Sequence, residues 1–353
     1  MSRVRVRGWW LLPLLVAAMF AAPWPAWMIE HGYARRLYPR IQQVVTSFSN
    51  LTGAAVIDVG LVLVALFLLW RVVQFIRAGR DRGWGSGAWE LARRIVRVAA
   101  LLALTFLLLW GLNYRRVPLE DTLRGGSGGE TSPEALLALA TTAAQSANAL
   151  RDAALLEPAG YSEIATRLEP SFQQGLQRLG LPPMQVAGRP KISHVLTPFF
   201  TAAGVSGMLN PVALESIVHP DLLPFERPMV LAHEWAHLAG FADEADASAI
   251  AWLACVTGDP ALAYSAHFFV VLQTASQLRR DEWRAIRETL SPGVIEDIDA
   301  LRARLSRQQP AVRDTASKVY DGYLRSNRVE DGIRSYSRVV RVLLTPPMQS
   351  VLK

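Results

Sequence analysis

The chain has 353 residues, of which 51% are hydrophobic and only 19% charged, with a formal net charge of +7. Soluble domains carry about 25% charged residues, so the composition favours a protein with membrane-spanning segments. Many arginines flank apolar segments, which is typical of membrane edges, and the sequence lacks the basic, aromatic-interleaved stretch that binds nucleic acid. The single cysteine, Cys255, excludes an intramolecular disulfide, and its apolar neighbours predict a buried, unreactive thiol.

Three apolar segments lie in the first third of the chain, at about residues 8–28, 54–76 and 95–112. Each has close to the ~20 residues that a helix needs to cross the hydrocarbon layer of a membrane. We therefore predict three transmembrane helices. Tryptophans near their ends predict an interfacial belt: Trp9, Trp10, Trp24, Trp27, Trp70 and Trp110.

The first segment is open to a second interpretation, because three arginines precede it and Ala21-Ala22 follows, as in a cleaved secretory signal. Pro23 and Pro25 make the cleavage region atypical and favour a retained span. Under both interpretations, the lysine and arginine counts place the arginine-rich stretch at residues 71–97 in the cytoplasm. The region after the third segment is then outside.

The sequence predicts a membrane anchor at residues 1–116, a flexible glycine-rich linker at 117–132 and an α-rich domain at 133–353. The predicted fold class is mainly α, with three N-terminal transmembrane helices followed by an α+β domain with a small sheet. Within that domain we expect helices at about 133–154, where Ser132-Pro133 gives the start, and at 162–179, ending at Gly180. Strands are predicted at 191–196 and 204–209, and helices from 225 to near the C-terminus.

Chemistry is indicated by the segment His233-Glu234-Trp235-Ala236-His237. Residues four apart share one face of a helix, so both imidazoles can bind one metal ion, and Glu234 lies next to them. This is the His-Glu-x-x-His arrangement of zinc hydrolases, in which zinc lowers the pKa of a bound water to about 7 and the carboxylate takes its proton. The motif predicts Zn²⁺ as cofactor, with His233 and His237 as ligands and Glu234 as the general base.

The third metal ligand must come from elsewhere. A turn at Gly240 followed by a new helix would bring Glu244 back to the metal, which would make a His-His-Glu site. Asp246 and Asp243 are alternative ligands, or acceptors for the N–H group of a ligand imidazole.

Further candidates have less specific signals. Tyr264, His267 or Tyr336 could polarise a substrate carbonyl. The segment 204–210 could form an edge strand that pairs with an extended substrate. The alternative for this segment is a plain structural strand.

Six segments carry a resemblance to a known family: Trp110-Gly111-Leu112-Asn113-Tyr114, Leu223-Pro224-Phe225, residues 233–237, Gly240 to Ala245, Tyr264-Ser265 and residues 331–340. Together they resemble a family of bacterial multi-pass membrane proteins that is catalogued as a domain of unknown function and assigned to the zincin metallopeptidases. The resemblance implies zinc at His233 and His237, Glu234 as base and Glu244 as the third ligand. The acidic stretch before Glu244 is shorter than in the family, and Asp246 replaces the usual Asn, an arrangement in which Asp246 would hold a ligand histidine.

Motif, topology and resemblance together predict a metallopeptidase in the bacterial inner membrane, with its catalytic domain outside the cytoplasm. The expected substrate is a peptide or protein near the membrane, and the expected partners include the lipid bilayer but no nucleic acid. Two alternatives are a non-catalytic envelope scaffold with a structural or vestigial metal site and a zinc amidase acting on cell-wall or lipid substrates. The sequence gives no indication of the oligomeric state.

Overall fold

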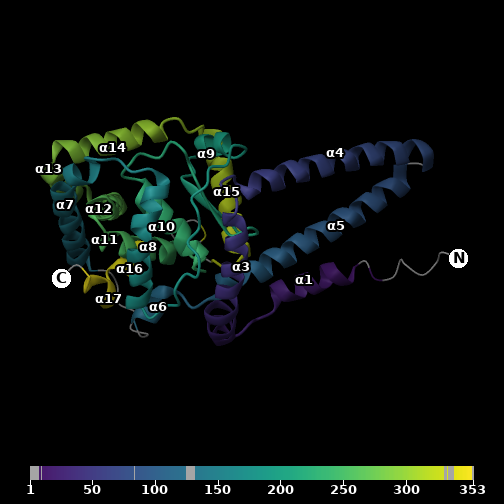
Figure 1. The fold of residues 1–353 in the computed structure, drawn as a ribbon, viewed down its shortest axis with the longest axis horizontal. Coiled ribbons are helices and arrows are strands. Elements are labelled where there is room, and N and C mark those ends of the chain that lie inside the picture. The colour runs from purple at the N-terminus through teal and green to yellow at the C-terminus, as the bar shows by residue number, and fades with distance from the viewer. Residues whose placement is uncertain are drawn as a thin grey trace.

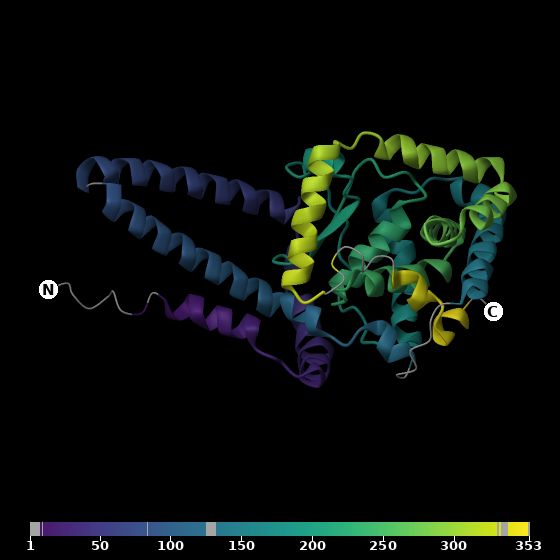
Figure 2. The same cartoon turned by 180° about the vertical axis from the view of Figure 1, so that it is seen from behind.

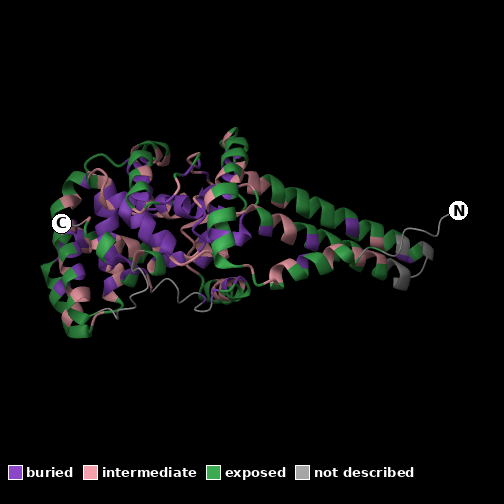
Figure 3. Cartoon of the chain, turned by 90° about the horizontal axis from the view of Figure 1, so that it is seen from below, coloured by how far each residue is buried: buried purple, intermediate pink, exposed green. Residues whose placement is uncertain are grey.

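The computed structural model describes residues 8, 10–82, 84–124, 132–329, 332 and 338–351, and it consists mainly of helices with one two-stranded sheet. A globular part is built around the C-terminal two thirds of the chain, and three helices, α1, α4 and α5, extend from one side of it as an arm (Figures 1 and 2). Buried residues concentrate in the globular part, whereas most of the arm is exposed (Figure 3).

The N-terminal third contains the arm and the elements at its base. These are α1 (Leu11–Ala21), α2 (Ala26–Met28), the π-helix η1 (Ile29–Leu37), α3 (Tyr38–Asn50), α4 (Val56–Arg82), α5 (Trp84–Leu109), the 3₁₀-helix η2 (Gly111–Arg115) and α6 (Leu119–Arg124).

One helix, α4, is both long and apolar enough to cross a membrane among the described residues. Its stretch Val56–Arg77 has a mean hydropathy of 2.4 and is 6% buried. The prediction of a single helix at 8–28 was wrong for the described residues, because the chain breaks between Ala21 and Ala26, where two prolines stand. The two pieces, Leu11–Ala21 and Ala26–Asn50, count as a second candidate only as one broken span with a bend of 104°.

The helix α5 is less apolar over the length of a span, since Arg93, Arg94 and Arg97 lie near its middle. It ends at Leu109, before the predicted boundary at 112. Trp110 was predicted in the interfacial belt, but it is 4% exposed and packs in the core of the globular part. The structure therefore supports one or two spanning helices from their length and composition.

The described residues of the globular part are mainly helical with one small sheet, as predicted. Helices α7 and α8 begin and end close to the predicted positions, with Ser132 accepting a hydrogen bond from the N–H of Ala135 as the N-cap of α7. The elements are α7 (Pro133–Leu155), α8 (Tyr161–Arg178), α9 (Thr197–Ala203), β1 (Gly207–Asn210), β2 (Glu215–Val218), α10 (Arg227–Leu238), α11 (Glu244–Val256), α12 (Pro260–Ala275), α13 (Arg280–Thr289), α14 (Pro292–Leu305), α15 (Pro310–Ser326), α16 (Val339–Leu343) and α17 (Pro346–Gln349).

The small sheet differs from the predicted one. Strand β1 pairs antiparallel with β2, with Gly207 opposite Val218 and Asn210 opposite Glu215. The predicted strand at 191–196 is reduced to a single parallel bridge between Lys191 and Ile217 of β2. Residues 194–196 turn into α9 instead.

A single apolar core holds the globular part together. Helix α11 lies at its centre, and every residue from Glu244 to Cys255 is buried. Trp235 of α10 and Trp252 of α11 are fully buried in this core. Cys255 is also buried, as predicted. The same core includes Tyr38, Leu107 and Trp110, so the globular part takes in segments from the base of the arm.

Candidate metal centre

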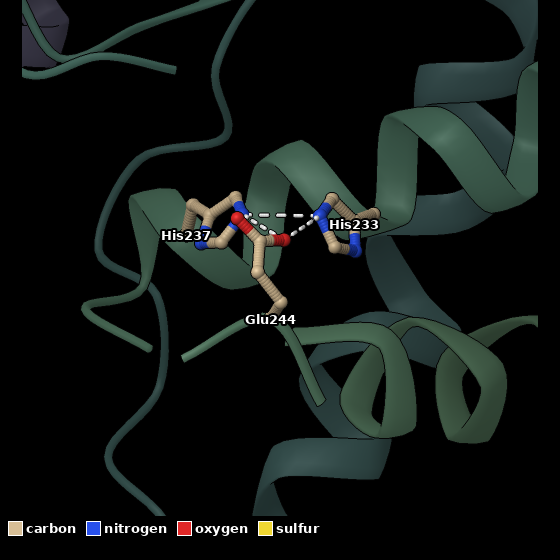
Figure 4. Close-up of side chains that lie close together, drawn as sticks. All are labelled: His233, His237 and Glu244. Atoms are coloured by element: carbon tan, nitrogen blue, oxygen red, sulfur yellow. Dashed lines mark hydrogen bonds and ion pairs between the residues drawn. The ribbon is translucent and has the colours of Figure 1, made fainter. Parts of the chain in front are cut away.

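The two histidines of the motif lie on α10, one turn apart, as the sequence predicts. Pro228 stands in the first turn, where a missing N–H has no cost. The apolar side chains of Leu231, Trp235 and Leu238 are fully buried and fix the rotation of the helix. The rings of His233 and His237 are 4.6 Å apart between centroids and turn the same way into the space between α10 and α11 (Figure 4).

The turn after α10 brings an acid back to these histidines. Gly240 adopts a left-handed conformation with φ of 92°, and a Cβ atom at this position would lie 2.9 Å from the ring of Tyr38. Asp243 then caps α11 by accepting hydrogen bonds from the N–H groups of Ala245 and Asp246. Glu244 is consequently the first residue of α11, with its carboxylate directed at both imidazoles (Figure 4).

Three potential ligand atoms form a small triangle. The Nε2 atoms of His233 and His237 are 3.0 Å apart, and Oε2 of Glu244 lies 3.1 Å from the first and 3.4 Å from the second. Ligand atoms about 2.0–2.1 Å from a tetrahedral zinc ion are about 3.3 Å apart. The triangle therefore fits three of the four corners around Zn²⁺, and it is the metal-ligand cluster found among the described residues.

The hydrogen bonds of the other ring nitrogens support this fit. Nδ1 of His237 donates to the carbonyl oxygen of Phe241 at 2.7 Å, which leaves the lone pair of the neutral ring on Nε2. Nδ1 of His233 lies 3.2 Å from the hydroxyl of Ser248, one turn beyond Glu244 on α11. Partners of this kind orient metal-binding imidazoles in proteins.

The electrostatics of the cluster favour positive charge at its centre. Burial lowers the pKa of His237, but the charge and hydrogen bond of Glu244 outweigh this effect and raise it to about 9. Burial and the neighbouring His237 lower the pKa of His233. Burial would raise the pKa of Glu244, but the two histidines hold it well below its usual range. Burial and the mutual charges and hydrogen bonds of the carboxylate and the two imidazoles account for all three directions.

Glu234 lies beside the triangle and is 3% exposed. Its Oε2 atom is buried and has no hydrogen-bond partner among the described residues. Burial raises the pKa of this carboxyl group to about 8. A Cβ atom built on Gly207 of β1 would lie 2.6 Å from Oε1, so the strand packs directly against this carboxylate. An unpartnered buried carboxylate next to a metal-ligand cluster is typical of a catalytic base.

Asp243 and Asp246, the alternatives to Glu244 as third ligand, bond to other groups. Asp243 is the N-cap of α11 and pairs with Arg338. Oδ2 of Asp246 accepts the N–H of Leu119 at 2.9 Å, and burial, followed by the charge of Asp243, raises its pKa to about 8. The expectation that Asp246 holds a ligand histidine was wrong, since the Nδ1 partners are Phe241 and Ser248.

The candidates for carbonyl polarisation lie on α12 or outside the described residues. The hydroxyl of Tyr264 donates to Asp297, and His267 is buried on the same helix, α12. Tyr336 lies outside the described residues.

Two aromatic residues that contact the ligand cluster were not among the site residues predicted from the sequence. The hydroxyl of Tyr320, on α15, donates to Oε1 of Glu244, the oxygen that does not face the histidines. Trp110 donates its indole N–H to the carbonyl of His237 at 3.2 Å. No local signal marks Tyr320, which lies 76 residues from Glu244.

Three of the matching segments meet at the centre, because Trp110 and Glu244 both contact His237. A family model described as "Protein of unknown function (DUF3810)" matches residues 33–344. The chain belongs to the DUF3810 family. No curated protein and no solved structure matches the chain significantly.

Proposed function

We propose that this DUF3810 member is a membrane-anchored zinc hydrolase that cleaves peptide bonds outside the cytoplasm. The observation that carries the proposal is the triangle of His233, His237 and Glu244, with the unpartnered carboxylate of Glu234 beside it. When bound there, Zn²⁺ would supply a Lewis acid that acidifies water and polarises a carbonyl group.

The residues around the triangle have separable tasks. The three ligands bind the ion, and Phe241 and Ser248 fix the ring orientations of the two histidines. Oε2 of Glu234 is the atom that takes a proton from the attacking water and later returns it to the leaving amine. Side-chain exposure of 18% at His233, against 8% at His237 and 2% at Glu244, indicates that the centre opens on the His233 side.

Strand β1 supports an extended peptide as substrate. Among the described residues, β1 pairs in the sheet with β2 alone. The N–H of His219 bonds to the carbonyl of Ser206, so in this register residues 208 and 210 face β2. The backbone groups of Gly207 and Leu209 therefore point to the open edge, where a peptide could add as a strand next to Glu234.

The arm supports the anchoring. Helix α4 has 27 residues, or about 40 Å of helix, which exceeds the hydrocarbon thickness of a membrane. We propose that α5 also spans, with its arginines near the cytoplasmic surface, and that α1 belongs to a third span. Arg77, Arg80 and Arg82 lie in the last turns of α4, which ends at the tip of the arm away from the globular part (Figure 1). The positive-inside rule then places the globular part outside the cytoplasm.

Zinc content tests the centre without assuming a substrate. Elemental analysis of the detergent-purified full chain should give one zinc per chain for the wild type and for Glu234→Gln, and almost none for His237→Ala. The matched control is His194→Ala, since His194 is exposed and outside the cluster. Equal zinc in the wild type and His237→Ala would remove the proposed site.

Activity tests the second half of the proposal. A peptide library digested by the wild-type protein and analysed by mass spectrometry should show cleaved amide bonds that are absent with Glu234→Gln. A zinc-loaded wild-type protein that cleaves no peptide would contradict peptidase function while leaving the metal centre in place. Amide cleavage in cell-wall or lipid substrates alone would favour the amidase alternative.

A further inference from the structure

Helix α3 buries one polar face, unlike an ordinary helix of a soluble protein. Gln42, Thr46 and Ser49 are buried against the globular part. The amide of Gln42 donates to the carbonyl of Val186 at 2.6 Å, and the hydroxyl of Thr46 donates to that of Leu214 at 3.0 Å. These hydrogen bonds fix α3 on the globular part through its polar face.

A second face, which runs from the end of η1 along α3 to the residue after it, exposes large apolar side chains. Leu37, Val44, Phe48 and Leu51 are 50%, 55%, 70% and 81% exposed. Their spacing of seven, four and three residues places them in one stripe along the helix. Full burial of one such side chain is worth about 1.5–3 kcal/mol, so a continuous exposed stripe of four indicates a surface that an apolar medium covers.

The direction of α3 indicates which medium this is. The axis of Leu11–Ala21 and that of Ala26–Asn50 differ by 104°, so α3 runs almost perpendicular to α1. Figure 1 shows α3 crossing the side of the globular part from which α1, α4 and α5 leave. Leu51 is followed after five residues by the start of α4, whose outer surface is also apolar and exposed.

We propose that α3 lies in the plane of the membrane interface, with its apolar stripe among the lipid chains just below the headgroups. The proposal rests on the membrane anchoring proposed above, because α4 must cross the bilayer for α3 to lie along its surface. Arg36 and Arg40 are exposed at the start of α3, where they can bind anionic headgroups.

This placement narrows the substrate class of the proposed hydrolase. The hydroxyl of Tyr38, the first residue of α3, donates to the carbonyl of Leu238 at 2.9 Å, directly after the ligand His237. A helix held in the interface therefore fixes the metal centre at a constant height above the lipid. Peptide bonds within membrane-associated proteins, close to the outer surface, would be presented to the centre in preference to those of freely diffusing peptides.

The single cysteine makes a depth measurement straightforward. Cys255 is fully buried and can be replaced by Ala, after which one new cysteine reports one position. Leu51→Cys tests the stripe, and Leu156→Cys is its matched control, because the two leucines are 81% and 80% exposed and α7, which ends next to Leu156, lies far from the arm (Figure 1). Leu66→Cys, within α4, tests the span itself.

Each full-length variant is labelled with an environment-sensitive fluorophore and reconstituted in phosphatidylglycerol–phosphatidylethanolamine vesicles. Quenching is measured with aqueous iodide and with lipids carrying a nitroxide near the headgroup or deep in the chain. We expect shallow lipid quenching of the label at position 51 to be several-fold stronger than at 156, with the label at 66 quenched by the deep nitroxide.

Three results would overturn the proposal. Iodide quenching at 51 equal to that at 156, with 66 in the lipid, would show that the anchor spans but α3 stays in water. Protection at 51 from both quenchers, dependent on protein density, would mean that a second copy covers the stripe. Iodide access at position 66 would contradict the membrane anchoring itself.

Discussion

Replacing Gly207 by Ala should impair the proposed base while leaving the metal ligands in place. The added Cβ atom would lie 2.6 Å from Oε1 and 3.0 Å from Cδ of Glu234. Non-bonded carbon contacts are normally about 3.5 Å or longer, so the carboxylate must move by about 0.5–0.9 Å. The carboxylate is the far end of a flexible side chain, and we therefore expect a loss of unfolding free energy of about 1 kcal/mol, at the low end for overpacking.

The effect on catalysis should be larger than the effect on stability. A misplacement of about 1 Å at a catalytic group can cost on the order of 100-fold in rate. We expect kcat for a cleaved peptide to fall by about 10- to 100-fold in Gly207→Ala. Zinc per chain should be unchanged, because the contact involves Glu234 and not the three ligands.

The assay compares kcat, zinc content and thermal unfolding of Gly207→Ala with those of the wild type. Gly60→Ala is the matched control, because its added Cβ atom has no neighbour within 4 Å. A wild-type rate in Gly207→Ala would refute the role given to Glu234 in this position. Loss of zinc would show instead that β1 supports the ligands.

Three further outcomes follow from the same contacts. Tyr320→Phe removes the hydroxyl that donates to Glu244 and should weaken zinc binding about 10-fold in a competitive chelator titration, whereas Tyr323→Phe on the same helix should not. Chelation of zinc should lower the melting temperature of the wild type by about 10 °C, since a tightly bound ion contributes about 4 kcal/mol to the free energy of unfolding. The melting temperature of His237→Ala should not change on chelation. Burial raises the pKa of Glu215, but hydrogen bonds from Asn210, Lys191 and the start of α4 together lower it below 4.5. The stability that this carboxylate contributes is present above that pH and is lost as the pH falls through the lowered pKa. Glu215→Gln should lower the free energy of unfolding at neutral pH by about 3 kcal/mol and should remove this pH dependence, as measured by chemical unfolding.

The proposed ligands could be predicted because their signals are local. Helical spacing alone places His233 and His237 on one face, and a glycine followed by an acidic helix start is enough to return Glu244 to them. The partners of these ligands could not be predicted. Tyr320 and Trp110 reach the centre from distant segments, and their hydrogen bonds depend on how the helices pack.

The predictions that failed also have physical causes. The alternating pattern at 191–196 suggested a strand, but Oδ2 of Asp58 accepts the N–H of His194 at 2.8 Å, which holds this segment as a turn at the base of α4. Composition indicated one long apolar segment at 8–28, whereas backbone geometry at its prolines divides it. Hydrophobicity also could not show that α3 would bury its polar face, since the acceptors on Val186 and Leu214 are backbone carbonyls of other segments.

The base of the arm is a structural part of the proposed metal centre. The last carbonyl groups of a helix have no partner within it, and those at the end of α10 and in the turn after it receive donors from segments that flank the proposed spans. Trp110 donates to the carbonyl of His237, Tyr38 to that of Leu238 and Arg116 to that of Gly240 at 3.0 Å. These donors satisfy carbonyl groups at the end of the helix that carries both proposed histidine ligands. A shortened chain that begins at the glycine-rich linker would therefore lack hydrogen bonds that hold the proposed metal centre in place. The segments that flank the proposed spans and the helix that carries the proposed ligands therefore belong to one folding unit.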